Sequence, residues 1–229
     1  MIFVRENLAA RRFVLAQVAV LRAAEGGEAL IPVTPQPEPA NFNRIVRTPG
    51  QTILRRYPNL TTFSKGMDLW KNCLDDLRNA YKGVCSYCCF WVPSFCSVDH
   101  YEPKTKSPHL AYEWSNYRLA HQKINTYKGE STDVLDPFHI HEGWFTLDFA
   151  NCFVKPNSGL PQDVQEAIAS TITRLRLNRD DTLVQQRFDI VRDYSKGLYP
   201  LELLKTRYPF IAAELERQGL QDTIKGTIP

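Results

Sequence analysis

The feature of the sequence that most limits its fold is a cluster of cysteines. Five of the six cysteines fall between Cys73 and Cys96, and Cys152 stands apart. A secreted disulfide scaffold distributes its cysteines over a short chain, whereas a single cluster within 229 residues is more typical of metal binding. Within the cluster, Cys85-x-x-Cys88 has the spacing of a thiolate pair in a structural zinc site. We therefore expect a small metal-supported element inside a larger protein.

The N-terminal region predicts a helix followed by a stiff connector. Residues 6–24 contain helix formers without Gly or Pro, and four prolines between Pro32 and Pro39 favour an extended segment. The apolar run 13–21 resembles a signal peptide only weakly, because Arg22 follows directly and no convincing cleavage pattern is present. Its nine residues are also too few to cross a bilayer. We expect a helix packed on the body of a cytoplasmic protein with no membrane partner.

The segment before the cysteine cluster is basic and contains one strong helical pattern. Between Ala40 and Lys82 there are eight Lys or Arg residues against three acidic ones, whereas the net charge of the whole chain is only +3. This local excess could attract a polyanion or could simply be a solvated helix face. Pro49-Gly50 is typical of a turn, and apolar residues three and four positions apart predict a helix over residues 62–81.

The rest of the chain predicts a hairpin and several helices. Residues 84–101 are rich in Cys, Val, Phe and Tyr and are divided by Pro93-Ser94, which favours two short strands in a β-hairpin. Residues 114–125 lack helix breakers and predict a helix, and the C-terminal third predicts three more. The first of these C-terminal helices opens at Pro161 and has an apolar stripe of Val164, Ile168, Ile172 and Leu175. The second contains Leu183, Phe188 and Val191 and ends near Gly197. The third opens at Pro200 and is interrupted at Pro209.

The residues between Asp99 and Asn125 suit the cleavage of a phosphodiester bond. That reaction needs a base that takes a proton from water and a cation that stabilises charge on the phosphate. Asp99-His100 places an oxygen ligand beside an imidazole, and Asn125 could return an amide oxygen to the same cation. Two protein oxygens with water and a phosphate suit Mg²⁺. Adjacent strand residues point to opposite faces, so this arrangement requires the strand to twist or end near His100.

Over residues 85–129 the chain resembles the HNH endonucleases, the ββα-metal group of nucleases. The motifs that carry the resemblance are Val98-Asp99-His100-Tyr101-Glu102-Pro103-Lys104, Trp114-Ser115-Asn116-Tyr117-Arg118-Leu119 and Asn125-Thr126-Tyr127-Lys128-Gly129. A looser likeness over residues 42–193 is to bacterial HNH proteins of phage-defence type. Its landmarks are Thr48-Pro49-Gly50, Asp136-Pro137, Gly143-Trp144-Phe145 and Leu177-Asn178-Arg179.

The resemblance implies roles for individual residues. His100 corresponds to the general base, and Asn116 to the asparagine that holds the loop and helps to orient that histidine. Asp99 and Asn125 match the ligands of Mg²⁺, Mn²⁺ or another divalent cation. The cations expected at the DNA phosphates are Lys104 and Lys128, together with Arg118, which on its expected helix could instead cap a surface ion pair. The expected products carry 5′-phosphate and 3′-hydroxyl ends.

The family's structural zinc site is incomplete in this sequence. HNH proteins with such a site pair one Cys-x-x-Cys with a second just before the last Asn. Here the second pair is replaced by His121-x-x-Ile124, and isoleucine cannot bind a metal. Zn²⁺ could keep Cys85, Cys88 and His121, with Cys89 or Cys96 as substitutes. Alternatively, apolar packing has replaced the ion.

These patterns predict an α+β fold that is mostly helical around a central ββα-metal element. The expected segments are an N-terminal helix and connector (1–39), a basic helical segment (40–84), the HNH core (85–130) and a helical C-terminal region (131–229). The predicted function is metal-dependent cleavage or nicking of DNA, with a role in phage defence. One alternative is a nucleic-acid-binding module without activity, and another is a subunit controlled by an ATPase or sensor protein.

Overall fold

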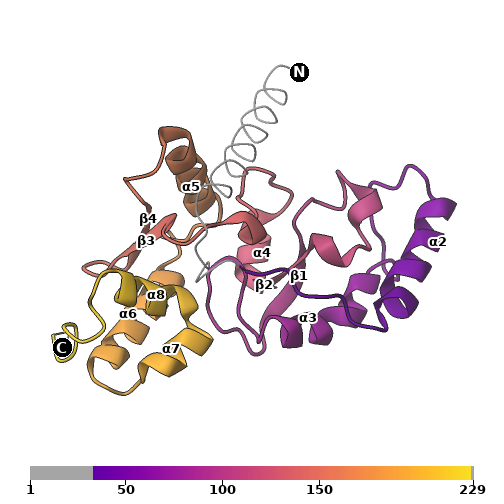
Figure 1. The fold of residues 1–229 in the computed structure, drawn as a ribbon. Helices are drawn as coiled ribbons and strands as arrows, with labels where there is room; N and C mark the ends of the chain where they lie inside the picture. The colour runs from indigo at the N-terminus through magenta and orange to yellow at the C-terminus, as the bar shows by residue number, and fades with distance from the viewer. Residues whose placement is uncertain (1–32, 228–229) are drawn as a thin grey trace. The chain divides into compact units, whose positions relative to one another are not determined.

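The computed structural model describes residues 33–227, which form a mixed α+β protein with two small antiparallel sheets (Figure 1). The described residues divide into two compact units. The N-terminal unit consists of residues 33–132 together with Thr206–Tyr208, and the C-terminal unit of residues 133–205 and 209–227. The helix predicted over residues 6–24 lies outside the described part of the chain. No described helix is long and apolar enough to cross a membrane.

A two-stranded sheet lies at the centre of the N-terminal unit. Strands β1 (Cys96–His100) and β2 (Tyr117–His121) are antiparallel, with Cys96 opposite His121 and His100 opposite Tyr117. Helix α4 (Gln122–Lys128) follows β2 directly. Helix α3 (Leu74–Ala80) and the 3₁₀ helix η2 before it (Leu69–Cys73) also pack against β1. Strand β1 therefore contacts α4 as well as α3 and η2.

The alternation of side chains along β1 assigns its residues to different neighbours. Ser97 is hydrogen-bonded to the Asn125 side chain of α4, and Asp99 is bonded to Lys128 at the end of α4. Val98 belongs instead to the apolar core shared with α3, and His100 contacts the Trp70 ring of η2. Asp99 and His100 therefore face opposite sides of the strand, as the period of two along a strand requires.

The core of this unit is built around aromatic side chains from several segments. Its buried members are Phe42, Val46, Cys73, Leu77, Val98, Ala111, Tyr112, Trp114, Tyr117 and Leu119. The connector before Phe42 has no helix or strand, yet the backbone of Gln36 accepts a hydrogen bond from Trp114 Nε1 and donates one to the Tyr81 hydroxyl. The described part of the connector thus forms no helix or strand, and it packs on this core.

The turn predicted at Pro49-Gly50 is wrong. Both residues lie in the first turn of α2 (Thr48–Arg56), which continues the π-helical turn η1 (Asn43–Arg47). Proline is tolerated at a helix start because its missing N–H would have no partner there. Gly50 is buried against Tyr112, and an added Cβ would lie 2.2 Å from Tyr112 Cγ. Its role here is close packing.

The helix predicted over residues 62–81 is too long. The chain bends at Gly66, whose φ of 91° favours glycine, and helical structure begins only at Leu69 with η2 and continues as α3. The apolar stripe is nevertheless buried or half-buried, with Leu77 in the core and Phe63, Trp70 and Leu74 packed against it. The periodicity identified the packed face correctly and the helix length incorrectly.

The predicted hairpin within residues 84–101 is also wrong. Val84 and Trp91 form only an isolated bridge around the segment Cys85–Cys88, here called the cysteine knuckle. Strand β1 pairs instead with β2, across a loop of residues 101–116. The segment 114–125, predicted to be one helix, divides into a 3₁₀ turn at Trp114–Asn116, the strand β2 and the start of α4, so the prediction is correct only for its last residues. Its residues Tyr117–Ala120 are buried, and pairing with β1 outweighs their compatibility with a helix.

The C-terminal unit contains the helices that the sequence predicts and one sheet that it does not. These helices are α5 (Gln162–Arg174), α6 (Asp181–Ser195), α7 (Leu201–Arg207, ending in the N-terminal unit) and α8 (Pro209–Arg217). The stripe from Val164 to Leu175 is buried as predicted, although Phe188 is 38% exposed. The unpredicted sheet pairs β3 (Phe145–Asp148) with β4 (Phe153–Pro156).

Candidate functional site

A pocket of about 540 Å³ lies beside β1 in the N-terminal unit. It receives side chains or backbone from β1, η2, α4 and the loop after β1. The lining residues are Trp70, Lys71, Leu74, Cys96, Ser97, Val98, Asp99, His100, Pro103, Lys104, Thr105, Asn125, Gly129 and Glu130. Three of the residues predicted for the reaction, Asp99, His100 and Asn125, thus line the same pocket.

His100 is held as a neutral imidazole with a defined tautomer. Its Nε2 lies 2.9 Å from the Ala111 carbonyl oxygen, which can only accept a hydrogen bond, so Nε2 carries the proton. Burial lowers the pKa of His100 to about 3, so the ring is uncharged at neutral pH. Nδ1 keeps its lone pair and has no hydrogen-bond partner within residues 33–227. Edge-on contacts with Trp70 and Tyr117, at centroid distances of 4.7 and 5.2 Å, fix the ring plane.

Asp99 is buried in a polar network of its own. Its Oδ2 accepts a hydrogen bond of 2.5 Å from the Tyr87 hydroxyl, and its Oδ1 lies 3.1 Å from Lys128 Nζ. Burial raises the pKa of Asp99, while Lys128 and the Tyr87 bond act in the opposite direction. A carboxylate offers about four lone-pair positions. The two bonds leave capacity for a further ligand.

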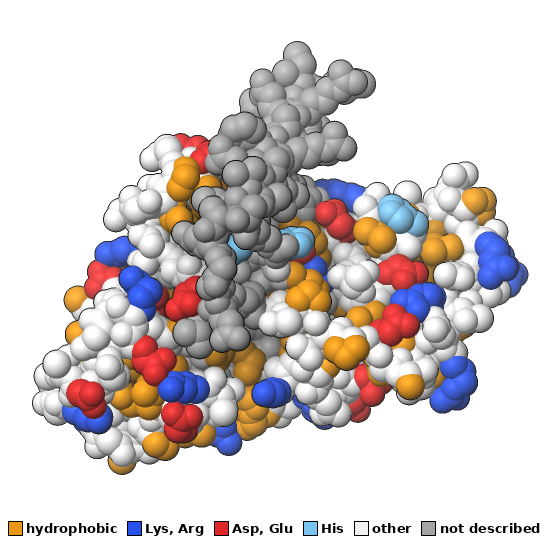
Figure 2. All heavy atoms as spheres, in the orientation of Figure 1, with side chains coloured by type: hydrophobic (Ala, Val, Ile, Leu, Met, Phe, Trp, Pro, Cys, Tyr) orange, Lys and Arg blue, Asp and Glu red, His pale blue; other side chains and the backbone are white. Residues whose placement is uncertain are grey.

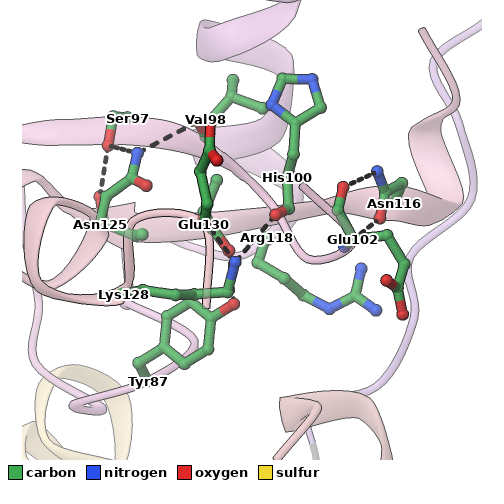
Figure 3. Close-up of polar contacts among 12 residues, drawn as sticks. Tyr87, Ser97, Val98, His100, Glu102, Asn116, Arg118, Asn125, Lys128 and Glu130 are labelled. Atoms are coloured by element: carbon green, nitrogen blue, oxygen red, sulfur yellow. Dashed lines mark hydrogen bonds and ion pairs between the residues drawn. The ribbon is translucent and has the colours of Figure 1, made fainter. Parts of the chain in front are cut away.

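Asn125 is oriented by the strand that it faces. Its Nδ2 donates to Ser97 Oγ at 2.9 Å and to the Val98 carbonyl oxygen at 3.3 Å (Figure 3). Because both donor hydrogens are used, the amide cannot flip without losing them, and Oδ1 is the remaining acceptor. A carboxylate and an amide oxygen beside one pocket are ligands that a hard divalent cation prefers. The residues present therefore fit Mg²⁺ or Mn²⁺ in chemical type.

Asn116 holds the loop that follows His100. Its Oδ1 accepts the backbone N–H of Glu102 at 2.8 Å, and its Nδ2 donates to the carbonyl oxygens of Glu102 and Leu110 (Figure 3). The side chain does not touch His100 directly. It fixes the segment up to Leu110, next to the carbonyl of Ala111 that anchors the His100 ring. Asn116 is thus placed to hold the loop, as predicted.

The three cations predicted at DNA phosphates occupy different environments. Lys128 Nζ is fully buried between Asp99 and the His100 carbonyl oxygen. Arg118 lies in β2 and not in a helix, so that prediction is wrong, and its guanidinium is buried and bonded to the carbonyl oxygens of Ser115 and Tyr117. Lys104 lines the pocket with its Nζ 5.2 Å from the Trp70 ring centroid. Lys104 is therefore the best placed of the three to meet a phosphate.

Positive charge elsewhere on the N-terminal unit is mixed with negative charge. Arg47 pairs with Glu38 and Glu113, and Lys71 pairs with Asp68. Figure 2 likewise shows blue and red side chains interspersed on the visible face. The exposed cations of the basic segment without an ion pair in the described part are Arg44, Arg55, Arg56, Lys65 and Lys82. These five account for the local excess of charge found in the sequence.

The cysteine knuckle is formed, but His121 does not join it through its imidazole. Burial raises the pKa of the Cys85 thiol, yet hydrogen bonds from the Cys88 thiol and from the backbone of Cys88, His121 and Tyr87 outweigh burial and lower it to about 7. The backbone N–H of His121 lies 3.2 Å from Cys85 Sγ, while its Nδ1 accepts the N–H of Lys123 and caps α4. Within residues 33–227 no group of three or more His, Cys, Asp and Glu side chains is arranged to hold a metal.

Two residues at the site were not predicted from the sequence. Tyr87 donates to Asp99, and Trp70 packs on His100 and under Lys104. The position of Tyr87 between Cys85 and Cys88 is the one sequence feature that could have indicated its role. Trp70 belongs to the stripe that predicted packing, and nothing in its spacing indicated a second role.

Comparison with known proteins adds no family to these observations. No protein-family model matches the chain, and no curated protein matches it either.

Proposed function

We propose that this protein is a metal-dependent endonuclease of the HNH type that hydrolyses phosphodiester bonds in DNA. The observation that carries the proposal is the state of His100, which is neutral, anchored through Nε2 and without a partner at Nδ1 among the described residues, beside a pocket that Asn125 also lines. An acceptor nitrogen held in this way can take a proton from water. Strands β1 and β2 with α4 would form the ββα-metal element.

Each residue of the site has a separate role in the proposed reaction. Asp99 and Asn125 would hold the divalent cation, whose charge would stabilise the scissile phosphate. His100 would accept the proton of the attacking water at Nδ1. Asn116 keeps the loop that carries the ring's anchor in place, and Lys104 would bind a phosphate of the substrate at the mouth of the pocket.

Nicking of supercoiled plasmid tests this proposal. The wild type should convert supercoiled to open-circular DNA with Mg²⁺ or Mn²⁺ and should stop when a chelator is added. His100→Ala should remove the activity, whereas His109→Ala, a change of an exposed histidine in the neighbouring loop, should leave it intact. Undiminished nicking by His100→Ala would refute the assignment.

One observation favours a second function, a nucleic-acid-binding module without activity. Lys128 already neutralises Asp99 inside the protein, and a resident ammonium competes electrostatically with a divalent cation. Such a module would bind through Lys104 and the exposed cations of the basic segment. It predicts salt-dependent binding to DNA in a gel-shift assay and no product with any metal.

A further proposal is that the nuclease acts in phage defence under the control of an ATPase or sensor protein. Pull-down with neighbouring gene products would test it.

A further inference from the structure

The carboxylate of Asp99 is held by two donors that lie outside its own strand. The Tyr87 hydroxyl binds Oδ2 at 2.5 Å, and Lys128 Nζ binds Oδ1 at 3.1 Å. Figure 3 shows the Tyr87 ring beside the Lys128 ammonium, on the side of β1 opposite the His100 ring. Asp99 is 2% exposed, so water cannot replace either donor freely. The direction of its remaining lone pairs is therefore set by these two contacts.

The cysteine knuckle fixes Tyr87 from both sides. The backbone N–H of Ser86, the preceding residue, donates to the Leu119 carbonyl oxygen of β2 at 2.8 Å. The Cys85 N–H donates to the Phe90 carbonyl oxygen at 2.8 Å, and Cys85 Sγ accepts the N–H of His121 at 3.2 Å. The short loop that carries Tyr87 is thus bonded to the same strand that pairs with β1. The hydroxyl reaches Asp99 from a rigid base.

We propose that Tyr87 is a positioning residue for the divalent-cation site, acting through Asp99 and supported by the Cys85–Cys88 knuckle. The inference rests on the proposed function, because it concerns the ligand assigned there. The aspartate side chain has two rotatable bonds, and one donor on each carboxylate oxygen restricts this side chain to one orientation. Outer-shell partners of this kind typically change metal affinity about 10- to 100-fold when they are removed. The knuckle would therefore contribute to the reaction site whether or not it holds zinc.

The test compares Tyr87→Phe with Tyr112→Phe. Each change removes one hydroxyl and its hydrogen bond from the N-terminal unit. Tyr112 is the control because its hydroxyl donates to the Met67 carbonyl oxygen at 2.9 Å and has no contact with Asp99. Binding of Mn²⁺ to the full chain is measured by electron paramagnetic resonance, and thermal unfolding in chelator is measured in parallel. Tyr87→Phe should weaken Mn²⁺ binding about tenfold, and Tyr112→Phe should leave the Mn²⁺ affinity at the wild-type value.

Kinetics give a second readout that a purely structural role would not alter. With Mn²⁺ below saturation, Tyr87→Phe should lower kcat and leave KM for DNA unchanged, and a higher Mn²⁺ concentration should restore most of the rate. Equal Mn²⁺ affinities for the two variants would overturn the inference, as would a wild type that binds no Mn²⁺. A wild type that binds Mn²⁺ but cleaves no DNA would instead refute the nuclease and leave the role of Tyr87 standing on the binding data.

Discussion

Replacement of Lys128 by methionine should destabilise the N-terminal unit strongly. Lys128 Nζ is fully buried, 3.1 Å from Asp99 Oδ1 and 2.9 Å from the His100 carbonyl oxygen. Methionine fills a similar volume but leaves Asp99 as a buried charge without its ion-pair partner. Removing one member of a buried pair costs about 3–5 kcal/mol. The free energy of unfolding should fall by this amount at neutral pH.

The pH dependence of this loss has a definite sign. Burial raises the pKa of Asp99 and Lys128 opposes that effect, so Lys128→Met should raise the pKa further. An acid whose folded-state pKa lies above its unfolded value destabilises the fold fully above the folded-state pKa, and the effect shrinks as the pH falls from there to the unfolded pKa. The deficit of Lys128→Met relative to the wild type should therefore be smaller at acidic pH than at neutral pH.

Urea unfolding followed by tryptophan fluorescence in chelator measures this loss. Three of the four tryptophans, Trp70, Trp91 and Trp114, lie in the N-terminal unit, so the signal reports mainly on it. Asp99→Asn combined with Lys128→Met should be less destabilised than Lys128→Met alone, because the double variant removes both charges of this buried pair. A loss below about 1 kcal/mol for Lys128→Met, comparable to that of an exposed ion pair, would refute the reasoning.

Two further predictions concern packing and phosphate contact. Gly50→Ala should destabilise the protein by about 1–3 kcal/mol in the same urea assay despite the helix preference of alanine, because its Cβ would lie 2.2 Å from Tyr112 Cγ. Gln51→Ala, a change of the next and exposed residue of α2, is the control, and an equal effect of both changes would contradict the packing argument. Lys104→Gln should weaken DNA binding and reduce the slope of log affinity against log salt concentration by about 1, measured by fluorescence anisotropy in Ca²⁺. The control is exposed Lys196→Gln, which should leave this slope unchanged. An unchanged slope for Lys104→Gln would exclude Lys104 as a phosphate contact.

The sequence identified the residues of the candidate site better than the elements that carry them. Asp99, His100 and Asn125 line one pocket, although Asp99 and His100 face opposite sides of β1 and the strand and helix boundaries around them differ from those predicted. Residues 114–125 satisfy the preferences of a helix, but pairing with Cys96–His100 makes Tyr117–His121 a strand, and the helix α4 begins only at Gln122. That pairing is a tertiary interaction, which local propensity cannot reveal.

The partners of Asp99 illustrate the same limit. Lys128 was expected to face a phosphate because the resemblance to the HNH endonucleases places it at a basic position of the motif. Its burial depends on the length of α4, which ends at Lys128 and brings the ammonium back to the end of β1. Tyr87 reaches Asp99 only because the knuckle is bonded to β2 through Ser86. The position of Tyr87 between Cys85 and Cys88 is the one sequence signal for these contacts, and the burial of Lys128 has none.

The central claim is that His100 acts as the general base, and single-turnover cleavage of a labelled DNA duplex with saturating Mg²⁺ tests it most directly. We expect His100→Ala to lower the single-turnover cleavage rate about 10²- to 10⁴-fold, measured below the unfolding temperature of each variant, while the DNA affinity stays close to that of His109→Ala. A His100→Ala rate within a factor of a few of the His109→Ala rate would contradict the account.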